Sequence, residues 1–89
     1  MQKKRRKLNK DFEKKIYSSK KNVELVLAKI YDIDDEDIQK EYMSAFNRVV
    51  YSYDALKEDY ELQGFTDDSE ELLANYKNAF NLFESEFEI

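Results

Sequence analysis

The sequence contains one glycine, Gly64, and no proline in 89 residues. Tight turns depend heavily on these two residue types, so a sheet of many short strands would lack its turns here. Lys and Glu, which form helices readily, are abundant, and 39% of the residues are charged. The hydrophobic fraction of 42% is enough for a packed core in one small domain. We therefore predict an all-α protein.

Three amphipathic stripes follow one another along the chain. In each stripe the large side chains recur at steps of three and four residues, which is the period of a helix with one buried face. The stripes are Phe12, Ile16, Ser19, Val23, Val26, Ile30 and Ile33, then Tyr42, Phe46, Val49, Tyr53, Leu56 and Tyr60, then Leu73, Tyr76, Phe80, Phe83 and Phe87. They predict helices over about 11–32, 35–63 and 67–87.

Acidic residues and the glycine mark the expected helix ends. Asp34 or Asp35 is expected to cap the second helix, and Gly64 to end it in the left-handed conformation. The segment 66–71 offers a capping box closed by Glu in either of two registers. Short connections predict an antiparallel up-down-up three-helix bundle, or alternatively an elongated coiled-coil-like hairpin with a third helix. The second helix is long enough that a kink or break near 52–54 is a further expectation.

Positive charge is concentrated at the start of the chain. Residues 1–21 have a net charge of +8, whereas residues 22–89 have a net charge of −13. We predict a flexible basic arm over 1–10 and a single helical domain over 11–89. The candidate contacts with nucleic acid or an acidic partner are Lys3, Lys4, Arg5, Arg6, Lys7, Lys10, Lys14 and Lys21.

The charge distribution permits several partners. The basic residues could neutralise phosphates in a salt-sensitive, sequence-independent way, although the acidic remainder would repel a duplex. Alternatively, the arm is only solvated or docks on an acidic surface. A contrary hypothesis is that the acidic body mimics nucleic acid and inhibits an enzyme that binds it. Few apolar anchors accompany the basic strip, so a membrane partner is unlikely.

The side chains most used in catalysis and metal binding are missing. The sequence has no His and no Cys, which removes the usual general base and the commonest zinc ligands. The acidic segment 32–37 does not fit an EF-hand, because Asp37 and Met43 stand where Gly and Glu are required. We predict no enzyme activity, no cofactor and no metal site. No signal segment or membrane span is expected, which predicts a cytoplasmic protein.

Aromatic residues exceed what a small helical core needs. There are seven Tyr and six Phe, and Tyr is favoured at protein interfaces. The candidate interface lies on the second helix and comprises Tyr42, Met43, Phe46, Val50, Tyr51 and Tyr53. We predict a non-enzymatic binding or regulatory protein that acts by protein–protein interaction, with a partner or as a homodimer. The composition is typical of an AT-rich bacterial or phage gene, which suggests a phage or mobile-element accessory protein.

Overall fold

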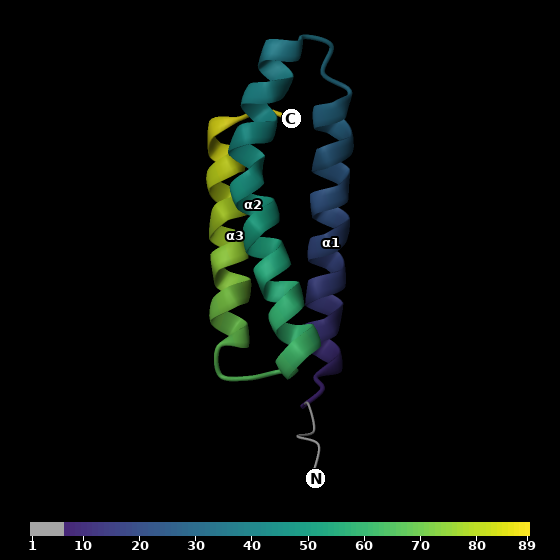
Figure 1. Ribbon diagram of the computed structural model, residues 1–89, viewed down its shortest axis with the longest axis vertical. Coiled ribbons are helices and arrows are strands. Elements are labelled where there is room, and N and C mark those ends of the chain that lie inside the picture. The colour runs from purple at the N-terminus through teal and green to yellow at the C-terminus, as the bar shows by residue number, and fades with distance from the viewer. Residues whose placement is uncertain (1–6) are drawn as a thin grey trace.

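The computed structural model describes residues 7–89 and contains three α-helices. They are α1 (Lys10–Tyr31), α2 (Glu36–Gln63) and α3 (Ser69–Glu86). Each helix runs antiparallel to the preceding one, and Figure 1 shows α2 lying between α1 and α3. The molecule is elongated, with extents of 55 × 22 × 18 Å. The predicted all-α three-helix bundle is confirmed, and every helix end lies within two residues of its expected position.

The central helix, α2, packs against both of its neighbours. It is a single helix of 28 residues, so the break considered near 52–54 does not occur. Ser52 lies within that segment, and its hydroxyl donates to the carbonyl of Arg48 one turn earlier at 3.0 Å. The buried apolar side chains are Phe12, Val23, Val26, Ile30, Phe46, Val49, Tyr53, Leu56, Leu73, Tyr76 and Phe83. The three stripes therefore converge on one core. None of the helices in residues 7–89 is both long and apolar enough to cross a membrane.

Side chains cap the first two helices. The Asn9 side chain accepts from the Phe12 N–H at 3.0 Å, so α1 begins one residue earlier than expected. Between the two candidate caps for α2, the structure selects Asp35. Its carboxylate accepts from the N–H groups of Asp37 and Ile38 at 2.9 and 3.1 Å. These bonds satisfy amides that have no partner within the helix.

Gly64 ends α2 with a positive φ of 73°. The positive φ was expected, but the ψ of −157° is not the left-handed helical value. This combination is essentially restricted to glycine, and it lets the chain leave the helix in an extended direction. The next residue, Phe65, donates its N–H to the carbonyl of Lys7 at 2.6 Å.

The start of α3 differs from the predicted capping box. Asp68 makes no side-chain capping bond. Instead, the Thr66 N–H donates to the Ser69 hydroxyl oxygen at 2.8 Å, and the Thr66 hydroxyl oxygen accepts from the Asp68 N–H at 3.2 Å. Ser69 is almost fully buried, and its bond to Thr66 takes the place of the expected box closed by Glu.

The predicted flexible arm is held in place at its end. Besides the Lys7 contact, the Asn9 N–H donates to the Tyr60 hydroxyl oxygen at 3.0 Å. The Phe12 ring packs on the rings of Tyr60 and Phe65 at centroid distances of 5.7 and 5.0 Å. Residues 7–10 are thus attached to the end of α2 and the α2–α3 connection, and residues 1–6 lie outside the described part of the chain.

Candidate functional site

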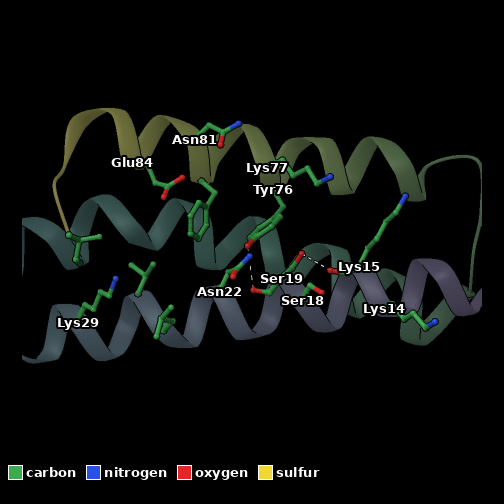
Figure 2. Close-up of a pocket in the computed structure, with 14 residues that line it drawn as sticks. Lys14, Lys15, Ser18, Ser19, Asn22, Lys29, Tyr76, Lys77, Asn81 and Glu84 are labelled. Carbon is green, nitrogen blue, oxygen red and sulfur yellow. Dashed lines mark hydrogen bonds between the residues drawn. The ribbon is translucent and has the colours of Figure 1, made fainter.

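A groove of about 640 Å³ separates α1 from α3. It exists because both helices pack mainly on α2 and make few contacts with each other. Figure 2 shows Tyr76 and Glu84 of α3, and Asn22 and Lys29 of α1, extending into the space between the two helices. Along α1 the lining runs from Lys14 to Lys29, so the groove follows most of that helix.

The floor of the groove carries apolar side chains, although the lining as a whole is about equally polar and apolar. Val26 of α1 and Phe80 of α3 line it, together with the buried ring of Tyr76. At its edges Leu25 is 58% exposed and Ile89 is 40% exposed. Apolar side chains in a concave surface are typical of binding sites, because a ligand that covers them removes them from water.

Lysines line the groove on both sides. Lys14, Lys15 and Lys29 come from α1, and Lys77 comes from α3. All four are exposed, and the lining includes one carboxylate, that of Glu84. The groove is therefore positive although the chain as a whole carries a net charge of −5. Cations beside an apolar floor favour an anionic ligand with an apolar side.

Neutral polar groups occupy the middle of the groove. The Tyr76 hydroxyl donates to the Ser19 carbonyl at 3.3 Å, and the Ser19 hydroxyl donates to the Lys15 carbonyl at 2.8 Å. Burial raises the pKa of Tyr76 above its ordinary value; Glu84 adds to this effect, and the bond to Ser19 partly opposes it. The phenol is therefore neutral at physiological pH and serves to link α3 to α1.

The predicted basic contacts are only partly brought together. Lys3, Lys4, Arg5 and Arg6 lie outside the described residues. Lys14 lines the groove, whereas Lys10 and Lys21 are exposed on α1 without lining it. The Lys21 ammonium lies 4.8 Å from the centre of the Tyr17 ring. Lys7 lies beside Gly64, at the α2–α3 connection.

Sequence reasoning missed three of the groove lysines, which are Lys15, Lys29 and Lys77. A signal for the α1 side was present, since Lys15, Asn22 and Lys29 recur at intervals of seven residues. Residues at this interval lie on nearly the same face of a helix. Lys77 is far away in the sequence, and only the packing of α3 brings it to the groove.

The candidate interface on α2 is largely used within the chain. Phe46 is fully buried and Tyr53 is 7% exposed, so neither offers surface to a partner, contrary to our expectation. The reason is that α3 covers this side of α2 with its own aromatic side chains. Burial also raises the pKa of Tyr53, with Asp54 and Glu24 contributing. Tyr42, Met43 and Val50 pack partly buried against the core, and Tyr51 is 80% exposed.

The acidic clusters do not form a metal site in the described part of the chain. Among residues 7–89 no group of three or more carboxylates is arranged to hold a metal ion. No family model matches the sequence, and no significant match was found among curated proteins or solved structures.

Proposed function

We propose that this chain is a non-enzymatic protein-binding module whose groove between α1 and α3 receives a segment of a partner protein. The observation that carries the proposal is the groove that α2 leaves uncovered, with the apolar side chains of Leu25 and Ile89 exposed at its edges. Burial of apolar surface favours association by about 25 cal/mol per Å². Binding then regulates the partner by occupying it.

The chemistry of the groove supports binding rather than catalysis. Its polar groups are ammonium, amide and hydroxyl groups and the carboxylate of Glu84. The raised pKa of Tyr76 makes that phenol a weak acid, and its hydroxyl already donates to the Ser19 carbonyl. A hydroxyl nucleophile needs a base in hydrogen-bonding reach, and the chain has no His to provide it.

Site-specific photo-crosslinking in cells tests this function. A photoreactive amino acid replaces Leu25 in the groove or, as a matched control, Leu62, which is 77% exposed on α2. We expect Leu25 to crosslink to one defined protein and Leu62 not to. A purified crosslinked protein that fails to bind the unmodified chain would refute the proposal, and so would the absence of crosslinks at both positions. Crosslinks to the chain itself would instead indicate the homodimer.

Nucleic-acid binding is a second candidate. Lys10, Lys14 and Lys21 are exposed on α1 at intervals of four and seven residues, which places them on one side of the helix. Binding to a mixed-sequence duplex should then fall steeply with salt and weaken when Lys3 to Lys7 are neutralised. Undetectable binding at low salt would remove this candidate.

A further inference from the structure

We infer that the groove between α1 and α3 binds an acidic amphipathic helix of a different protein. This inference rests on the proposed function and specifies the partner. The apolar stripe of the helix would lie on Phe80 and on Leu25 and Ile89 at the groove edges, and its carboxylates would face the groove lysines. The partner segment would become the fourth helix of the bundle.

The dimensions of the groove suit a helix. The lining extends along α1 from Lys14 to Lys29, which at 1.5 Å per residue is about 22 Å, or four helical turns. A helix there would contact both α1 and α3, as the members of a four-helix bundle do. A helix also satisfies its own backbone hydrogen bonds, whereas an extended segment on this apolar floor would leave amides unpaired.

The distribution of lysines indicates acidic flanks on both sides of the partner stripe. Lys15 and Lys29 lie on the α1 side and Lys77 on the α3 side, so carboxylates on either flank would meet a cation. Such exposed ion pairs contribute mainly to choice of partner and orientation, while the apolar floor contributes most of the affinity. A basic helix would be repelled from both sides except beside Glu84.

The same charges disfavour the other occupants. A duplex would extend beyond the groove and meet the remainder of the chain, where residues 22–89 carry a net charge of −13. A short acidic helix would contact only the groove. Two copies of the chain placed groove to groove would bring the groove lysines of both copies together. The outward side of α2 offers no continuous stripe, because its most exposed apolar residues, Tyr51 and Leu62, are eleven positions apart with Glu58 between them.

A pair of synthetic peptides tests the sign of the partner's charge. The first is a fluorescein-labelled 18-residue helix with a leucine stripe and glutamates on both flanks, and the second has lysine in place of every glutamate. Fluorescence anisotropy with the full-length chain at low salt measures both affinities. We expect the acidic peptide to bind at least about tenfold more tightly than the basic one. Equal affinities, or no binding of the acidic peptide, would overturn the inference.

Matched charge reversals locate the binding site. The groove variant combines Lys15→Glu, Lys29→Glu and Lys77→Glu, and the control combines Lys20→Glu, Lys40→Glu and Arg48→Glu at exposed positions outside the groove lining. Both variants change the net charge by the same amount, and circular dichroism checks that both fold. We expect the groove variant to lose at least about tenfold in affinity for the acidic peptide and the control less than about threefold. Similar losses would mean non-specific attraction and overturn the inference.

A neutral substitution tests the contribution of apolar contact in the groove. Leu25→Asn removes an exposed apolar group from the groove, and Leu62→Asn removes a comparable group elsewhere. Only Leu25→Asn should weaken binding of the acidic peptide.

Two results would assign the groove to another occupant and overturn the inference. Duplex binding that the groove variant abolishes would assign the groove to nucleic acid. A dimer that Leu25→Asn dissociates would assign it to a second copy. A partner crosslinked at Leu62 alone with no peptide binding would refute the groove but leave a protein-binding function. Peptide binding without any cellular crosslink would refute the protein-binding function in cells but leave the groove as a site for an acidic helix.

Discussion

Phe46 has no exposed surface, and its ring packs against the rings of Phe83 and Phe80 at centroid distances of 4.8 and 6.1 Å. Both contacts are edge-to-face, the arrangement that the charge distribution of aromatic rings favours. Tyr42 extends this cluster, since its ring lies 4.8 Å from that of Phe87 and its hydroxyl donates to the Glu88 carbonyl at 3.1 Å. Aromatic side chains that we assigned to an external interface therefore hold α3 on α2.

Replacing Phe46 should accordingly damage stability much more than replacing Tyr51. We expect Phe46→Ala to reduce the free energy of unfolding by about 3–5 kcal/mol, because it leaves a cavity in the core. Tyr51 is 80% exposed, so Tyr51→Ala should change stability by no more than about 0.5 kcal/mol. Chemical denaturation followed by circular dichroism measures both values. Comparable losses would show that Phe46 is not a core residue.

The phenol of Tyr76 should make stability sensitive to alkaline pH. Its pKa is raised in the folded state, chiefly by burial, whereas an unfolded tyrosine ionises near pH 10. As the pH rises, the Tyr76 phenol therefore loses its proton first in the unfolded state. Its contribution to the free energy of unfolding should be constant below about pH 9 and fall as the pH rises above about 10. Tyr76→Phe should reduce this alkaline loss while costing about 0.5–1.5 kcal/mol at neutral pH through the missing bond to Ser19.

Denaturation curves between pH 7 and 11 test this prediction. Tyr51→Phe is the matched control, because that side chain is mostly exposed. We expect the control to retain the alkaline loss of the unmodified chain in full. An alkaline loss that Tyr76→Phe leaves unchanged would contradict the assignment, and it would direct attention to Tyr53, whose pKa burial also raises.

At the scale of the elements, local hydrogen bonds decide where each helix begins and ends. Asp35 caps α2, and Gly64 ends it with a backbone conformation that other residues avoid. The α2–α3 connection also holds the start of α1 through the Phe65 N–H and the Lys7 carbonyl. This end of the bundle therefore joins all three helices, and the groove begins only beyond it.

The two neighbouring aspartates provide a test of capping. Asp35→Ala should cost about 0.5–2 kcal/mol of unfolding free energy, because the Asp37 and Ile38 amides lose their acceptor. Asp34→Ala removes the same charge one residue earlier and should cost less than about 0.5 kcal/mol. Urea denaturation of the two variants at one pH gives the comparison. A greater loss for Asp34→Ala would place the cap one residue earlier.

At the scale of the whole molecule, α2 is covered on two sides while α1 and α3 leave a groove between them. Buried contacts on both sides of a helix raise the free energy of its local unfolding, whereas a helix with one covered side unfolds locally at lower free energy. Both α1 and α3 pack mainly on α2, and α1 does so less extensively than α3. Binding of a fourth helix would cover the second side of α1.

Hydrogen exchange should reveal this difference. We expect the slowest-exchanging amides in the middle of α2, around Val49 and Leu56, and faster exchange in α1 around Val26. Addition of the acidic peptide should slow exchange in α1 and α3 more than in α2. Mass spectrometry of exchanged fragments, or NMR of single amides, measures the rates. Uniform protection in the free chain, or slowing confined to α2, would contradict this description of the bundle.

Most of the fold was predictable from the residues themselves. The three stripes and the scarcity of Gly and Pro predicted the helices and their order, because amphipathic periodicity and short connections act locally. The stripe even included Ser19, whose backbone carbonyl accepts from the Tyr76 hydroxyl. The candidate site was less predictable. Lys14 was identified, but Lys77 joins it only through tertiary packing, and the exposure of an aromatic residue on α2 depends on whether α3 covers it.

The sequence by itself determined the all-α class, the three helices, the buried stripe of each one and the concentration of positive charge near the start of the chain. These properties depend on residues a few positions apart. The tertiary structure alone decided that α1 and α3 remain separated, that α3 rather than an external partner covers Phe46 and Tyr53, and that Lys15, Lys29 and Lys77 share a groove. The physical reason is that a stripe specifies which side of a helix is buried, whereas the angle and spacing between helices depend on how all the side chains pack together.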